Sequence, residues 1–361
     1  MNSVKRLGMM AALVGVLGIV PAFGAHAQSA GACTLAAADC TLLTTANSNV
    51  GKETSFTQDF DFKVTVKTGT QNVDISATGT GPFTVNTGAS MTDMNSVHNA
   101  VDMALDITGS TTGTGTDQSG KFSMVITKGV FYFKTDKQDW QGVKLSDALK
   151  AAQSQGSSMT GGSSSGAAGQ AAALFQDPAI LQSLTNLANT PSLVVLTKTA
   201  NAPTLDGQTM AEFVYTISLK GIATSKDLYP LIRAILKASG STTDLPDAQL
   251  AQFSSIAGSA LSNTTFTITR WVGTTDNEYH ALGIDLVAAI DPTTLGSSGD
   301  PVNANFHLLV KLSKVGQPVT VTAPAGAKMI DTSSMSGSSS GSATMAATMD
   351  AAATMVATAA Q

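Results

Sequence analysis

The side chains that could do chemistry are few in this 361-residue chain, and they are widely scattered. The four histidines, His26, His98, His280 and His307, form no HxH or HxxxH pair, and no cysteine–histidine cluster has the spacing of a zinc site. The serines fall largely in low-complexity segments, without a nucleophile elbow between a strand and a helix. The pattern therefore predicts no metal, no cofactor and no enzymatic activity.

Two pairs of carboxylates could in principle carry acid–base chemistry. Asp59 and Asp61 flank Phe60, and in a strand both would lie on the same outer face. Asp102 and Asp106, four residues apart, would likewise share the outer face of a later strand. A catalytic pair would need further partners, so both pairs are interpreted as parts of a solvated surface.

The parity of two histidines places them relative to the neighbouring apolar residues. His307 lies between Phe306 and Leu308, which predicts that it points to the polar face of its strand. His280 shares the parity of Leu282, so it is expected at the rim of the apolar face. We interpret it as a boundary histidine with satisfied hydrogen bonds.

Two cysteines, Cys33 and Cys40, are the only ones in the chain, and they lie close together. In an exported chain such a pair predicts a disulfide that closes a small loop. The alternative is that Cys33 is a lipidated terminus, because residues 29–32 loosely resemble a lipobox. Lipidation would leave Cys40 unpaired, so the disulfide is favoured.

The first 27 residues have the features of a secretory signal peptide. A short basic region, Lys5 and Arg6, precedes an apolar run at 7–20, and Ala25-His26-Ala27 suits cleavage before Gln28. The alternative is a membrane anchor, but the run is shorter than the roughly 20 residues that span a bilayer. The sequence predicts an exported protein of the periplasm, cell envelope or extracellular space, in preference to a membrane-anchored lipoprotein.

Composition divides the remaining chain and excludes some partners. A net charge of −5, 12% charged residues and the absence of a basic run argue against binding to nucleic acid or docking on anionic lipid. Residues 28–50 form an N-terminal segment with the disulfide, and 51–330 form one domain. Within it, 154–170 is rich in Ser and Gly and is predicted to be a flexible loop. Residues 331–361 are predicted to be a disordered tail.

Apolar and polar residues alternate in many short runs of the 51–330 segment. Such alternation is typical of an antiparallel sheet with one buried and one solvated face. The runs lie at 60–66, 73–77, 101–107, 122–126, 131–133, 213–219, 266–272, 282–288, 306–312 and 319–321. Predicted turns at 68–69, 79–81, 206–207 and 273–277 separate several of them.

Helical periodicity falls mainly in the middle of the chain, at 171–189, 225–239 and 246–261. Pro178 is expected in the first turn of the first helix, Pro230 in that of the second, and Ser225 or Asp227 could cap the second. The predicted fold is α+β and mainly β. One strongly curved antiparallel sheet forms a half-barrel, and helices cover its concave apolar face.

Several segments resemble the LolA-like lipoprotein-carrier superfamily. The run KGVFYFK at 128–134, followed by Trp140, is similar to the central hairpin of that family. The segments LDGQ at 205–208, RWV at 270–272 and LSKVGQPVTVTAP at 312–324 also resemble it. The most similar branch is the LppX/LprG group of mycobacterial lipid-binding lipoproteins. The resemblance covers most of 50–330, and it implies a half-barrel that holds acyl chains or glycolipids between sheet and helices, without catalytic residues.

The expected function is that of a monomeric cell-envelope protein that binds or carries a lipid or other hydrophobic ligand, with transient membrane contact. An interaction module with a solid core is the alternative, and amphipathic helices with modest strand lengths argue against an outer-membrane barrel. Inward sheet positions and one helix are expected to line the cavity: Phe60, Phe62, Val64, Met103, Leu105, Phe122, Met124, Phe131, Phe133, Phe213, Tyr215, Ile284, Leu286, Leu231 and Ile235.

Overall fold

The computed structural model describes residues 33–49, 52, 54–85, 101–113, 117–136, 138–147, 178–188, 190, 192–200, 203–205, 207–238, 245–295 and 298–330. The predicted signal peptide at 1–27, the Ser/Gly loop at 154–170 and the tail at 331–361 lie outside the described residues. His98 lies outside them as well.

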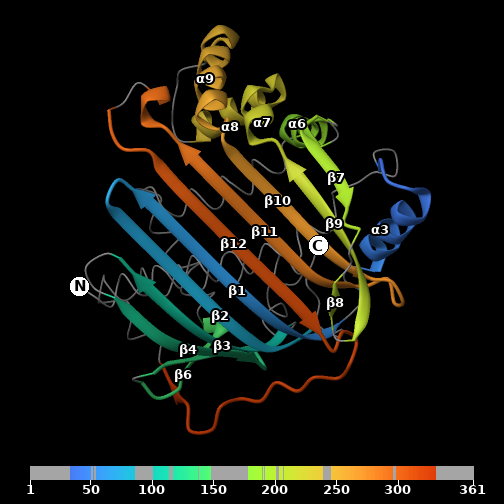
Figure 1. Ribbon diagram of the computed structural model, residues 1–361. Coiled ribbons are helices and arrows are strands. Elements are labelled where there is room, and N and C mark those ends of the chain that lie inside the picture. Colours follow the sequence, from blue (N-terminus) through green and yellow to red (C-terminus); the bar gives the residue numbers. More distant parts are fainter. Residues whose placement is uncertain are drawn as a thin grey trace.

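The described part of the chain is mainly β and forms one large, curved, open sheet (Figure 1). Its 13 described strands run in the order β13-β6-β5-β4-β3-β2-β1-β12-β11-β10-β9-β7, and β8 pairs with β9 outside this path. Neighbouring strands are antiparallel except for the short β13–β6 pair. The strands are β1 Ser55–Thr68, β2 Gln71–Val85, β3 Val101–Thr112, β4 Gln118–Thr127, β5 Val130–Thr135, β6 Gln141–Lys144, β7 Val194–Lys198, β8 Thr204–Leu205, β9 Gln208–Ile217, β10 Thr264–Gly273, β11 Tyr279–Ile290, β12 Val302–Ser313 and β13 Lys328–Met329.

The chain reverses between strands at residues whose backbone adopts the left-handed conformation, with positive φ. Gly69, between β1 and β2, has φ 55°, and Gly207, between β8 and β9, has φ 77°. The β4–β5 hairpin turns through Lys128 and Gly129, at φ 50° and 71°. Asn277, with φ 60°, lies in the turn between β10 and β11, so the turns predicted at 68–69 and 273–277 are confirmed.

The turn predicted at 79–81 is wrong, because β2 continues through these residues. A Cβ on Gly79 would lie 2.2 Å from the Phe60 ring, and one on Gly81 would lie 1.8 Å from the Ala104 carbonyl oxygen. These glycines therefore allow close packing inside a strand instead of ending it.

The described helices are α3 Ala37–Asn49, α6 Pro178–Ala188, α7 Leu219–Thr224, α8 Tyr229–Ala238 and α9 Asp247–Ala260, with 3-10 turns η2 Lys226–Leu228 and η3 Pro292–Leu295. Pro178 begins α6, as predicted. The Ser225 hydroxyl accepts the Asp227 N–H, but it caps the 3-10 turn η2, and α8 begins only at Tyr229. Helix α3 was missed. Figure 1 shows α6 to α9 gathered at one end of the strands, whereas α3 lies near β9 and β10.

Two predicted strand ends differ from the structure. Leu219 begins α7, so β9 stops at Ile217. Residues 319–321 form no strand, although they alternate, because they lie beyond the turn that follows β12 and pair with no neighbour in the described sheet. The short strand β13 follows instead and pairs with β6.

Two apolar clusters form on one face of the sheet. The first lies over β1 to β5 and β12 and centres on Phe60, Leu105, Met124 and Leu308, whose exposed fractions are all 4% or less. The second lies over β7 and β9 to β11, and Leu43 of α3 packs into it. Each fully buried Leu, Phe or Met contributes about 1.5–3 kcal/mol by removal from water, so these clusters stabilise the fold.

Candidate ligand-binding face

Strand register places all thirteen sheet residues predicted to line a cavity on the same face. Phe62 pairs with Leu308 on one side and Ala77 on the other, and Leu105 pairs with Met124. Side chains directly opposite each other in a sheet share a face. The residues are Phe60, Phe62, Val64, Met103, Leu105, Phe122, Met124, Phe131, Phe133, Phe213, Tyr215, Ile284 and Leu286.

Burial differs between neighbouring rows of this face. One row crosses β9, β10, β11, β12 and β1, and every member is only half-buried: Ile217, Phe266, Leu286, Phe306 and Val64. The row beside it contains buried Tyr215, Ile268 and Leu308, at 6%, 8% and 1% exposure, with Ile284 and Phe62 half-buried. We call the first set the half-buried row. It lies at the end of the strands that leads into α7, which begins two residues after Ile217.

Aromatic contacts define the shape of the face. Phe62 and Phe306 meet edge to face with ring centroids 5.5 Å apart, and Phe131 stacks on Phe133 at 5.5 Å. Edge-to-face contact is a favoured arrangement of aromatic pairs. These rings therefore present rigid apolar surface that solvent partly reaches at Phe62, Phe133 and Phe306.

The two helical residues expected to line the cavity are less well placed. Leu231 is half-buried in α8, which packs against α6 and η2 at the end of the strands. The side chain of Ile235 lies outside the described residues.

Arg270 is a charged residue on the apolar face that its sequence pattern did not lead us to expect there. It pairs with Phe213 and Leu282 and is only 5% exposed. Its guanidinium carbon lies 5.1 Å from the ring centroid of Tyr215 and 5.6 Å from that of Tyr279, within cation–π range. In the sequence, Arg270 alternates in phase with Ile268 and Val272. This pattern could have predicted its position on the apolar face.

Burial changes the pKa values of the two tyrosines beside Arg270. Burial raises the pKa of Tyr215 above its usual value, although the nearby Arg270 charge acts in the opposite direction. Burial likewise raises the pKa of Tyr279, again opposed by Arg270. Both phenols therefore stay protonated in the neutral range, and they can donate hydrogen bonds next to the guanidinium.

Helix α3 covers the part of the face around Arg270. The Asn47 side-chain oxygen accepts from the Tyr279 hydroxyl at 2.7 Å and from Arg270 Nη1 at 3.4 Å. Lys198 on β7 forms an ion pair with Asp39 at 2.6 Å. Leu43 and Ala46, both fully buried, pack into the second apolar cluster.

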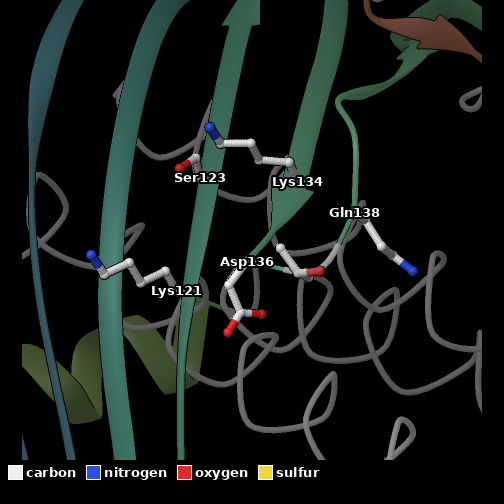
Figure 2. Close-up of a pocket in the computed structure, with 6 residues that line it drawn as sticks. Lys121, Ser123, Lys134, Asp136 and Gln138 are labelled. Atoms are coloured by element: carbon white, nitrogen blue, oxygen red, sulfur yellow. The ribbon is translucent and has the colours of Figure 1, made fainter.

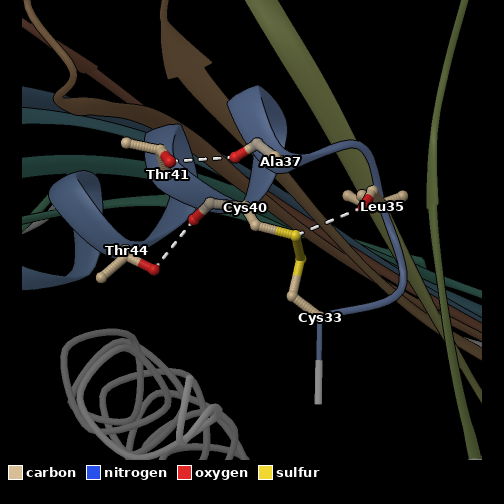
Figure 3. The surroundings of a disulfide bond; sticks show 6 residues. All are labelled: Cys33, Leu35, Ala37, Cys40, Thr41 and Thr44. Atoms are coloured by element: carbon tan, nitrogen blue, oxygen red, sulfur yellow. Dashed lines mark hydrogen bonds between the residues drawn. A yellow bond between two sulfur atoms is a disulfide. The ribbon is translucent and has the colours of Figure 1, made fainter. Parts of the chain in front are cut away.

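The predicted disulfide between Cys33 and Cys40 is confirmed, and it lies at the start of α3 (Figure 3). The Cys40 sulfur also lies 3.6 Å from the Leu35 carbonyl oxygen. The bond closes the segment that leads into the helix, so it restrains the N-terminal end of α3.

Both described histidines are paired with carboxylates. His280 is 7% exposed, and its Nε2 lies 2.9 Å from Asp276. Burial disfavours the charge on Asp276, but the Glu278 backbone N–H and His280 outweigh it, so the pKa of Asp276 is lowered. His307 points to the outer face, where its Nδ1 lies 2.6 Å from Asp285, as its parity predicted.

The outer face of the sheet is polar. Asp59, Asp61 and Asp106 are exposed there, and Asp102 accepts the Lys128 backbone N–H at 3.1 Å. A hollow of about 240 Å³ opens near the β4–β5 hairpin (Figure 2). Its polar lining consists of Lys121, Ser123, Lys134, Thr135, Asp136 and Gln138.

Two kinds of feature are absent from the described part of the chain. It contains no group of three or more His, Cys, Asp or Glu side chains placed to hold a metal ion. No helix in it is both long enough and apolar enough to span a membrane.

Comparison with known proteins does not assign the chain to a family. No protein-family model matches it, and neither does any curated protein. One solved structure that shows similarity comes from work on lipid–protein interactions in lipovitellin. The alignment covers 76% of this chain and 27% of the lipovitellin chain, with 8% sequence identity and a TM-score of 0.27. The chain thus spans about a quarter of that structure, and a similarity of this size supports no inference about fold or function.

Proposed function

We propose that this protein binds a lipid, or another ligand with a long apolar chain, on the apolar face of its curved sheet. The half-buried row carries the proposal. In a sheet face packed solid by the protein's own side chains, Phe266, Leu286 and Phe306 would be as inaccessible as Leu308, which is 1% exposed. They remain partly open to solvent instead, side by side across three strands.

An acyl chain suits this surface physically. Each methylene that leaves water for an apolar surface gains about 0.8 kcal/mol, so a chain lying along the half-buried row could bind without any polar contact. Binding by apolar burial would depend little on salt. Phe306 of the row and Phe62 of the neighbouring row meet edge to face and add aromatic surface there.

Several finer statements belong to the same proposal. Helices, including α8 with Leu231 and Ile235, would close the ligand against the concave face. The likeness of 128–134 and Trp140 to the LolA-like carriers, in particular the LppX/LprG group, favours such a layered cavity. The protein would act as an exported monomer of the cell envelope that carries its ligand without catalysis.

The second candidate is an interaction module whose core is solid and binds nothing. The fully buried residues of the first cluster, such as Leu105 and Met124 at 1% and 2% exposure, favour it for β3 and β4. The half-buried row lies elsewhere on the sheet, across β9 to β12 and β1, and distinguishes the two candidates.

Extraction of the purified protein with organic solvent, followed by mass spectrometry, tests the proposal. A stoichiometric lipid in the extract, together with saturable uptake of a fluorescent fatty acid, is expected. A clean extract and no uptake at all would favour the interaction module. Uptake measured at low and high salt adds a second criterion, because apolar burial predicts nearly equal affinities.

A further inference from the structure

Helix α9 lies at the end of the sheet where the half-buried row meets the helices. Figure 1 shows it as the outermost element at this end, beside α8 and α7. It ends at Ala260, four residues before β10 begins, and β10 carries Phe266 of the row. A ligand that entered or left the face at this end would pass close to α9.

One side of α9 packs inward on α7. Leu250, Ser254 and Gly258 follow each other at intervals of four and are all buried. Gly258 lies so close to α7 that an added Cβ would be 2.5 Å from the Thr224 methyl group. The orientation of α9 is therefore fixed, and its opposite side must face outward.

The outward side carries two large apolar residues. Phe253 is 61% exposed and Ile256 is 40% exposed, and their spacing of three places them on the same side of the helix. Single exposed apolar residues are common on protein surfaces. Two together on one outward helix face, at the end of an apolar sheet, are the kind of surface that contacts something.

The stretch of chain that carries this pair is uncharged. After Asp247, which pairs with Arg233, the sequence has no charged residue before Arg270. The other exposed residues of α9 after Asp247 are uncharged: Ala248, Gln249, Ala251, Gln252, Ser255 and Ser259. These residues of α9 carry no charge that would attract an anionic surface, and none that would oppose entry into a neutral lipid interface.

We propose that Phe253 and Ile256 of α9 insert into a lipid bilayer and dock the protein for exchange of its ligand. The purpose of this contact rests on the proposed lipid-binding function, but the contact itself does not. A second copy of the chain is a poorer occupant, because a stable dimer buries about 800 Å² on each partner. Two side chains cannot supply that area, whereas they suffice for a transient contact with membrane.

Flotation of the full chain with phosphatidylcholine vesicles tests the proposal. The wild-type protein is expected to float with the vesicles, and raising the salt to about 0.5 M should not release it. The double variant Phe253→Ser/Ile256→Ser should partition about tenfold less or weaker still, because most of its inserted apolar area is lost. Both positions are exposed, so the variant should fold normally.

The control variant is Met329→Ser, which removes an equally exposed apolar residue, 50% accessible, from β13 at the edge of the sheet. It should float like the wild type. A wild type that does not float, or a double variant that floats equally well, overturns the proposal. A concentration-dependent dimer in sedimentation velocity that the double variant abolishes would overturn it in favour of self-association.

Uptake of a water-dispersed fluorescent fatty acid, measured without vesicles, separates this proposal from the function on which it draws. The double variant should take up the fatty acid as the wild type does, but should acquire it more slowly from vesicles. A wild type that floats and yet takes up no fatty acid would refute lipid carriage and leave the membrane contact standing.

Discussion

The Tyr279 hydroxyl donates a hydrogen bond of 2.7 Å to the Asn47 side-chain oxygen, and this bond joins α3 to a strand 232 residues further along the chain. Arg270 Nη1 reaches the same oxygen at 3.4 Å. The contact lies beside the second apolar cluster, where Leu43 of α3 is buried. Helix α3 thus contacts the sheet through polar side chains near both ends, with the Lys198–Asp39 ion pair in its first turn, and through apolar packing in its middle.

Tyr279→Phe should loosen this fastening. It removes a partly buried hydrogen bond and leaves the Asn47 oxygen with a weaker partner, so we expect a loss of about 1–2 kcal/mol in the free energy of unfolding. Hydrogen exchange should show the loss of protection concentrated in α3.

The control is Tyr132→Phe, in a tyrosine of β5 that faces the outer side of the sheet. It should leave exchange in α3 unchanged. Equal exchange in α3 for the Tyr279 variant and the wild type would show that the Tyr279–Asn47 hydrogen bond is not needed to hold the helix.

Helix α3 also shows where sequence reasoning stops. Its residues, AADCTLLTTANSN, include three threonines and two asparagines, which are weak helix formers. The segment forms a helix because Leu43 and Ala46 pack on β9 and β10 and because the disulfide restrains its start. Both causes lie in tertiary structure, and a short isolated helix of this composition would not be stable.

The strands, in contrast, were largely predictable. Period-two alternation located most of them, and it placed thirteen site residues on one face, because register in a sheet preserves parity across strands. Alternation could not tell which positions of that face are buried and which are half-buried. That difference depends on which strands pair, and the pairing of β1 with β12 joins segments about 250 residues apart.

Glycines in β2 were misread as a turn for a physical reason. The same residue permits a turn and a close approach, and a single sequence does not distinguish the two uses. Gly79 serves the second use, because the Phe60 ring occupies the space of its missing side chain.

Gly79→Ala should therefore destabilise the protein. The new methyl group would lie 2.2 Å from the Phe60 ring and 3.0 Å from the Asp106 carbonyl oxygen, and Phe60 is only 4% exposed and cannot swing away freely. Overpacking of this kind costs about 1–3 kcal/mol, which should appear as a lower urea midpoint.

Gly120→Ala is the matched control, because Gly120 lies in the neighbouring part of the sheet and no described atom lies within 4 Å of the position that a Cβ would take there. It should be neutral or slightly stabilising, since alanine restricts the unfolded chain. Equal midpoints for the two variants would mean that Phe60 repacks without cost.

The Asp276–His280 pair should contribute to the acid limb of stability. The pKa of Asp276 is lowered in the folded protein, because the Glu278 N–H and His280 outweigh its desolvation. A carboxylate with a lowered folded pKa stabilises the fold above its unfolded pKa, and this stabilisation is lost as the pH falls through the folded pKa. The window lies below about pH 3.8, the ordinary value of an aspartate.

Asp276→Asn should therefore reduce stability at neutral pH and flatten its fall below pH 3.8. Urea unfolding across an acid pH series measures both effects. The side chain of Asp276 is 39% exposed, so solvent screening should keep the difference small. An acid limb as steep as that of the wild type would show that Asp276 contributes nothing to it.

Leu286→Trp should reduce ligand uptake without unfolding the protein. Leu286 is half-buried in the middle of the half-buried row, between Phe266 and Phe306, so a larger side chain would occupy the space proposed for an acyl chain. Val287→Trp is the matched control, because Val287 follows directly in β11, is 50% exposed and points to the opposite face. We expect the Leu286 variant to bind a fluorescent fatty acid about tenfold more weakly, and the Val287 variant to bind it like the wild type, with both retaining the wild-type circular dichroism. Equal losses in both variants would point to a general effect of tryptophan on β11, and unchanged uptake in both would place the ligand away from the half-buried row.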